Sequence, residues 1–163
     1  MNSSSATNAH DPLKFYLDKS HPEAWKAIGA LSVASAKAAR QAGLDREIVE
    51  LICLRVSQIN GCAYCLNVHT QRALRAGVSD QRLALLPAWE DSDVYSEVER
   101  AALFLAEAVT RLPSSEDRDF AQQVSAGVLT DDQFGAVQWL AITMNATNRI
   151  SIMSHHPVPR ADW

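Results

Sequence analysis

Apolar residues recur at intervals of three and four along most of the chain, a spacing typical of amphipathic helices. Capping residues and glycines divide this pattern: Asp45 precedes one helix, Asn60-Gly61 ends it, and Gly77 ends the next. No strand-length alternation of apolar and polar residues and no repeat of fixed period stands out. The pattern therefore predicts an all-α fold, with helices over residues 20–43, 45–61, 62–77, 79–86, 94–110, 114–127 and 130–154.

The helix predicted over residues 130–154 is apolar on nearly every side. A surface helix of a globular protein has one apolar stripe, so we expect this one to be buried centrally or to lie at a subunit interface. Its surplus of apolar surface predicts a homo-oligomer. Asn145, Asn148 and Arg149 interrupt it, and they either face solvent or satisfy polar groups at an interface.

Length and composition indicate one soluble domain. The chain has 163 residues, 47% hydrophobic and 21% charged, and we expect a flexible Ser/Asn-rich tail at 1–11 and a single helical domain at 12–163. The net charge of −4 and the scattered basic residues predict no nucleic-acid or membrane partner. No secretory leader and no 18-residue apolar run is present, which predicts a cytoplasmic protein.

Candidate chemistry begins where one predicted helix follows another. Cys62, Cys65 and His69 have C-x-x-C-x-x-x-H spacing, and on a helix their directions fall within about 60° of one another. Cys62 and Cys65 lie in the first turn of their helix, where free backbone N–H groups favour a thiolate. In a reducing compartment a close thiol pair is more often catalytic or metal-binding than structural. The spacing predicts a redox centre.

Glu50 belongs to the preceding predicted helix. If the two helices pack as a hairpin, its carboxylate reaches His69 or the thiols and serves as a base or relay. Two alternatives stay open at this point. One is a buried, inert cysteine pair, and the other is a structural zinc site with ligands drawn from Cys62, Cys65 and His69 together with Glu50, His155 or His156.

The remaining cysteine and the last histidines have simpler interpretations. Cys53 lies in the apolar run Leu51-Ile52-Cys53-Leu54, so we expect a small buried hydrophobic side chain. His155 and His156 follow the last predicted helix, where cations interact favourably with the helix dipole.

The motif as a whole resembles a known family. Glu50-x(11)-Cys62-x-x-Cys65-x-x-x-His69, set in the segment Gln58-Ile-Asn-Gly-Cys-Ala-Tyr-Cys-Leu-Asn-Val-His69, is similar to the alkylhydroperoxidase D-like branch of the carboxymuconolactone decarboxylase superfamily. The similarity extends over roughly residues 20–158. It implies a compact bundle of six to seven helices that assembles as a trimer or hexamer, with neither a metal nor an organic cofactor.

The resemblance also implies roles for four residues. Cys65 is the expected peroxidatic thiol, and Cys62 is expected to donate a proton and then close a disulfide with it. Glu50 and His69 are expected to form the proton relay. Tyr64 stands where the best-studied peroxidases of the family have an active-site histidine, and it is the clearest departure from their pattern.

The implied function is that of an alkyl hydroperoxide reductase-like peroxidase or disulfide oxidoreductase acting on organic hydroperoxides. An external dithiol or a lipoylated protein is the expected reductant. One alternative is a carboxymuconolactone decarboxylase-like lyase, whose chemistry does not need the C-x-x-C pair. The other is a non-enzymatic oligomer that senses redox state through the dithiol.

Overall fold

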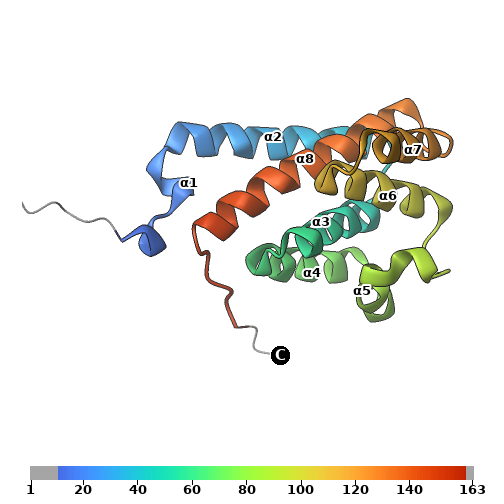
Figure 1. The fold of residues 1–163 in the computed structure, drawn as a ribbon. Coiled ribbons are helices and arrows are strands. Elements are labelled where there is room, and N and C mark those ends of the chain that lie inside the picture. The colour runs from blue at the N-terminus through green and yellow to red at the C-terminus, as the bar shows by residue number, and fades with distance from the viewer. Residues whose placement is uncertain (1–10, 161–163) are drawn as a thin grey trace, which may run out of the picture.

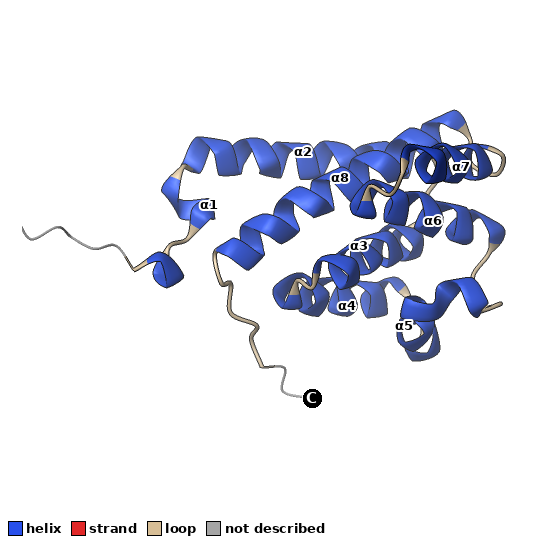
Figure 2. Ribbon diagram, in the orientation of Figure 1, coloured by secondary structure: helices blue, strands red, loops and turns tan. Residues whose placement is uncertain are grey.

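A computed structural model describes residues 11–160, which form helices joined by short connections and contain no strand (Figures 1 and 2). The predicted all-α fold is therefore confirmed. The helices are α1 Leu17–Ser20, α2 Pro22–Gln41, α3 Arg46–Asn60, α4 Ala63–Ala76, α5 Asp80–Leu85, α6 Glu97–Arg111, α7 Ser115–Ala126 and α8 Asp131–Met153, with two 3-10 turns, η1 Pro12–Lys14 and η2 Leu86–Asp91.

The predicted helices correspond to α2 to α8, and α1 is one short helix more than expected. Four residues are too few for a periodic pattern to reveal such an element. Of the predicted flexible tail at 1–11, only Asp11 falls within the described residues, where its side chain accepts a hydrogen bond from the Leu13 amide.

Local capping chemistry fixes the helix ends that carry the site. Asp45 begins α3, accepting a 2.9 Å hydrogen bond from the Ile48 amide. Gly61 ends α3 with a φ of 70°, a left-handed conformation that glycine adopts without steric penalty. Cys62 then caps α4, so α3 and α4 form a hairpin with a very short connection. The thiol pair consequently sits at the turn of this hairpin.

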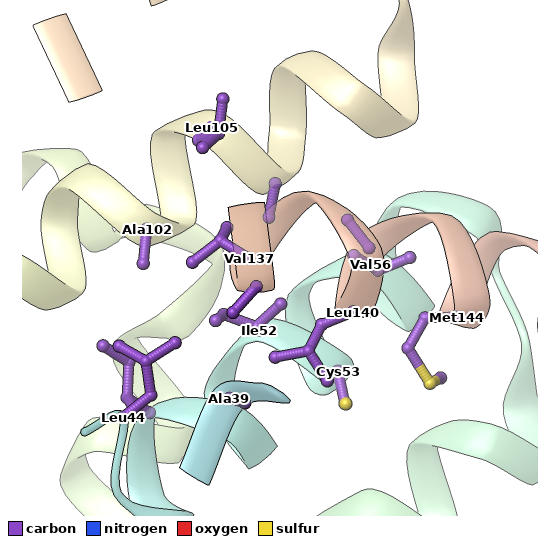
Figure 3. Close-up of a cluster of buried hydrophobic side chains, with 14 of the residues drawn as sticks. Ala39, Leu44, Ile52, Cys53, Val56, Ala102, Leu105, Val137, Leu140 and Met144 are labelled. Carbon is purple, nitrogen blue, oxygen red and sulfur yellow. The ribbon is translucent and has the colours of Figure 1, made fainter. Parts of the chain in front are cut away.

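The main hydrophobic core lies where α3, α6 and α8 meet (Figure 3). Ile52 and Val56 of α3, Leu105 of α6 and Val137 of α8 are almost completely buried there. Each branched side chain buried to this degree contributes about 1.5–3 kcal/mol relative to exposure. This packing fixes the position of α3, and with it the position of Glu50, which lies on the same helix.

The long helix α8 is buried on one side only. It packs against α2, α3 and α6, and Val137 and Ala141 are fully buried. Trp139 and Ile142 point elsewhere and are 52% and 45% exposed. The helix is therefore buried within the chain on one side, and on the other it presents apolar side chains that the described chain does not cover.

A buried ion pair ties the middle of the bundle together. Glu107 on α6 accepts hydrogen bonds from Arg55 Nε of α3 at 2.6 Å and from Trp89 Nε1 of η2 at 2.7 Å. Burial raises the pKa of the Glu107 carboxyl, but these donors and the nearby charges of Arg55 and Arg111 outweigh it and leave the pKa below its ordinary value. The carboxylate is thus stabilised in its charged form.

We expect Glu107→Gln to lower the free energy of unfolding by about 3 kcal/mol, because it leaves the buried Arg55 without a counter-charge. The carboxylate stabilises the fold fully above about pH 4.5, its ordinary pKa, and this contribution is lost as the pH falls through the lower folded-state pKa. Urea unfolding at pH 7 and pH 3 measures both effects. The difference in the free energy of unfolding between the unmodified chain and Glu107→Gln should be smaller at pH 3 than at pH 7. The exposed Glu90→Gln is the matched control; equal losses in both variants would contradict the prediction.

Candidate functional site

The thiol pair occupies the first turn of α4. Cys62 is the N-cap, and its Sγ accepts a hydrogen bond from the Cys65 amide at 3.3 Å. The two residues form a disulfide, with their Cα atoms 5.3 Å apart, a separation that suits such a bond. When the pair is reduced, the free amides of this helix terminus favour a thiolate at the same place.

The two sulfurs differ in their access to a ligand. A cavity of about 350 Å³ lies between α2, α3, α4 and α8, and Cys65 lines it whereas Cys62 does not. Cys65 is 5% exposed and Cys62 1%. Any molecule that enters this cavity therefore meets Cys65 and not Cys62.

Glu50 and His69 form a hydrogen-bonded pair on the wall of the same cavity. Glu50 Oε2 of α3 lies 2.7 Å from His69 Nδ1 of α4, and both side chains are about one-tenth exposed. Because a carboxylate only accepts, this contact assigns a hydrogen to His69 Nδ1 and leaves Nε2 as the other nitrogen of the ring. His69 lies one helical turn after Cys65. The structure thus brings together Glu50, His69 and Cys65.

A polar network anchors the hairpin turn to α8. Asn60, just before the turn, donates 3.0 Å hydrogen bonds to the side-chain oxygens of Asn145 and Asn148. Asn148 is fully buried and donates to Ser57 Oγ at 3.1 Å. Both asparagines of α8 therefore bond to α3 inside the chain, so Asn148 is not available to an interface with another subunit.

Cys53 lines the thiol cavity but differs chemically from the other two cysteines. It is 5% exposed and belongs to the core, beside Leu140 and Met144 (Figure 3). Burial raises the pKa of its thiol strongly, Glu50 adds to this rise, and the charge of Arg72 opposes it. The thiol therefore favours its protonated form, and the small buried side chain expected from the sequence is confirmed.

The sequence did not reveal that His156 lies over the thiol turn. Its ring packs edge-on against Tyr64, with centroids 5.3 Å apart, and stacks on Tyr16 at 6.1 Å. Nε2 is 3.2 Å from Asp18 Oδ1, and Nδ1 is 3.2 Å from Ser151 Oγ. These contacts connect the first and last segments of the described chain to Tyr64, which lies between the cysteines. No local sequence pattern predicts them.

The described residues form neither a metal-binding cluster nor a membrane-spanning helix. Among residues 11–160, no group of three or more His, Cys, Asp or Glu side chains is arranged to hold a metal ion, and His156 pairs with Asp18 instead. Over the same range, none of the helices combines the length and apolar character needed to cross a bilayer.

Comparisons with known proteins agree with this fold and motif. The family model described as carboxymuconolactone decarboxylase matches residues 22–108. The uncharacterized protein YdfG of Bacillus subtilis is 38% identical over 116 residues, which cover 71% of this chain and 79% of that protein. Alkyl hydroperoxide reductase AhpD of Corynebacterium aurimucosum is 40% identical over 68 residues, but these span only 41% of this chain and 36% of AhpD.

A solved structure extends the similarity to most of the fold. It is the crystal structure of a protein of unknown function from Agrobacterium tumefaciens, described as a candidate antioxidant defence protein AhpD. It superposes with a TM-score of 0.80 and 31% identity, covering 91% of this chain and 99% of the other. From the family match, the relatives and this structure, the chain belongs to the carboxymuconolactone decarboxylase superfamily as an alkylhydroperoxidase D-like member.

Proposed function

We propose that this protein is a thiol-dependent peroxidase that reduces organic hydroperoxides through the Cys62–Cys65 pair. The observation that carries the proposal is that one sulfur of a C-x-x-C pair, that of Cys65, lines the same cavity as the hydrogen-bonded Glu50 and His69. A nucleophile with an acid-base pair beside it in a partly enclosed cavity is the arrangement that covalent catalysis requires. Membership of the family supports an antioxidant role.

In the proposed first step, the Cys65 thiolate attacks one peroxide oxygen and the O–O bond breaks. The leaving alkoxide takes a proton from the Cys62 thiol, and Cys65 becomes a sulfenic acid. Glu50 and His69 take the proton that Cys65 loses when it ionises and return it to the hydroxyl group that leaves in the second step. The organic product is an alcohol.

In the second step, the Cys62 thiolate attacks the Cys65 sulfur, and the hydroxyl group leaves as water after protonation. Two thiols have then supplied the two electrons that reduce the hydroperoxide. An external dithiol, such as that of a lipoylated protein, exchanges with the disulfide and restores both thiols.

We also propose a homo-oligomeric, cytoplasmic protein. The exposed apolar side chains of Trp139 and Ile142 on α8 and of Val33 on α2 support the first proposal, since a second copy would remove them from water. The proposed cytoplasmic location rests on the thiol chemistry, because a reducing compartment returns a catalytic disulfide to the dithiol form.

A thiol count tests the function directly. We expect the reduced, unfolded protein to titrate with three thiols. After one equivalent of cumene hydroperoxide under native conditions, one thiol should remain, at Cys53, with a new disulfide between Cys62 and Cys65 by mass analysis. Cumyl alcohol, which lacks the O–O bond, is the control reagent. Unchanged thiols would overturn the proposal, and unchanged thiols with turnover of a lactone acid would favour the lyase alternative.

A further inference from the structure

A second cavity opens directly beside the thiol cavity. It has a volume of about 520 Å³ and lies between α2, the α2–α3 connection, α3 and α4. The two cavities share four lining residues, Ala36, Val49, Glu50 and Arg72. They therefore meet at the carboxylate that the proposed mechanism uses as a relay.

The second cavity is rich in free cations. Arg40 of α2, Arg46 of α3 and Arg72 of α4 line it. Within residues 11–160 these three guanidinium groups have no hydrogen bond or ion pair. The following arginines, by contrast, are held by carboxylates, side-chain amides or backbone carbonyls: Arg55, Arg82, Arg100, Arg111, Arg118 and Arg149.

The acidic groups of this cavity are already engaged. Asp45 accepts the Ile48 amide as a helix cap, and Glu50 is bonded to His69. The three arginines converge from three different helices on one hollow, in a chain whose net charge is −4. Three guanidinium groups against two carboxylates leave this cavity with an excess of positive charge, which favours an anionic ligand.

The thiol cavity offers the complementary property. Its lining includes Trp25, Val68 and Leu140. Hydroxyl groups that line it, such as those of Ser35 and Thr143, donate to backbone carbonyls of their own helices at 2.9 and 2.7 Å. Apart from Glu50, His69 and Arg72, its described lining carries no ionisable group other than thiols and Tyr64. This cavity suits an alkyl or aryl group.

We propose that the joined cavities bind a hydroperoxide that also bears a carboxylate. The organic part lies in the thiol cavity with the peroxide at Cys65 Sγ, and the carboxylate lies in the second cavity against Arg72, with Arg40 and Arg46 around it. Arg72 lies on α4 one turn beyond His69 and lines both cavities, so it is the residue that selects the anion at the junction. This assignment of substrate class rests on the peroxidase function proposed above.

The test uses the reduced full-length chain and does not require turnover. Iodoacetamide, a neutral reagent, alkylates Cys65, and octanoate or its uncharged analogue octanamide is added as a protecting ligand. We expect octanoate to protect Cys65 at concentrations about tenfold lower than octanamide, the difference that one charge-assisted contact provides. Arg72→Gln should remove this tenfold advantage.

Two variants keep the test decisive. Arg75→Gln removes an exposed charge from the same helix outside both cavities and should leave the octanoate advantage unchanged. Arg40→Gln, on α2, should weaken octanoate protection in the same direction as Arg72→Gln and replaces it if that variant does not fold. Equal protection by the two ligands, or an equal loss in Arg75→Gln, overturns the inference.

The outcomes also separate this inference from the function on which it rests. If octanoate protects in an Arg72-dependent way but no hydroperoxide oxidises the thiols, the carboxylate site stands and the peroxidase proposal fails. If cumene hydroperoxide closes the disulfide but octanoate gives no advantage, the peroxidase proposal stands and the carboxylate site fails. The rates of disulfide formation with a fatty-acid hydroperoxide and with its methyl ester then measure how strongly the site prefers a free carboxylate during oxidation. The free acid should react faster, and equal rates count against the inference.

Discussion

We expect Cys65→Ser to abolish peroxide-driven oxidation of the thiol pair, whereas Cys62→Ser still reacts once and stops at a sulfenic acid on Cys65. The reason lies in the different positions of the two sulfurs. Cys65 lines the cavity proposed to admit the substrate, and Cys62 is the more buried helix cap outside its lining. Without Cys62 no thiol remains that can resolve the intermediate, because Cys53 is held protonated in the core.

A dimedone-type probe followed by peptide mapping measures this outcome. The label should appear on Cys65 in the Cys62→Ser variant and be absent from Cys65→Ser. Cys53→Ala is the matched control and should oxidise like the unmodified chain. A sulfenic acid that maps to Cys62 in Cys65→Ser would reverse the assigned roles.

Glu50→Gln is expected to slow oxidation of the pair by about 10²- to 10⁴-fold, the usual effect of removing a general acid or base. Glutamine preserves the shape of the side chain and can still accept a hydrogen bond from His69 Nδ1, which Glu50 does at 2.7 Å. It cannot supply the negative charge that stabilises a protonated imidazole. The fold should therefore survive while proton transfer fails.

The measurement is the rate of disulfide formation and of thiol alkylation from pH 5 to pH 9, for Glu50→Gln and for His69→Ala. Both variants should change the pH profile as well as the rate. Glu47→Gln is the comparison, because Glu47 lies one turn earlier on α3 and pairs with Arg82 outside the thiol cavity. An unchanged profile in both site variants would remove Glu50 and His69 from the relay.

Features encoded by neighbouring residues were predictable from the sequence. Asp45 and Gly61 mark the ends of α3 by capping chemistry that acts over a few positions. The spacing of Cys62, Cys65 and His69 likewise follows from one helix. The Glu50–His69 contact also follows, once α3 and α4 are assumed to pack as a hairpin.

Features that depend on distant segments were not predictable. His156 and Asp18 meet only because α1 and the chain after α8 lie side by side. Neither segment contains a helix long enough for its apolar pattern to predict where it packs. The arginine cavity is similar, since Arg40, Arg46 and Arg72 are unremarkable surface residues until three helices converge. Such sites arise from tertiary packing, which single-sequence periodicity does not contain.

The position of Cys62 as the cap of the helical turn that carries Cys65 has a kinetic consequence for the proposed chemistry. The two residues are three positions apart, with Cα atoms 5.3 Å apart in the disulfide, so we expect ring closure to need no search through distant chain conformations. Well-oriented intramolecular partners behave as if present at effective concentrations of about 10⁵–10⁸ M. A second peroxide molecule, at any attainable concentration, competes poorly with such a neighbour. If the protein is a peroxidase as proposed, we expect this proximity to protect Cys65 from irreversible overoxidation and to let the catalyst survive a surge of its own substrate.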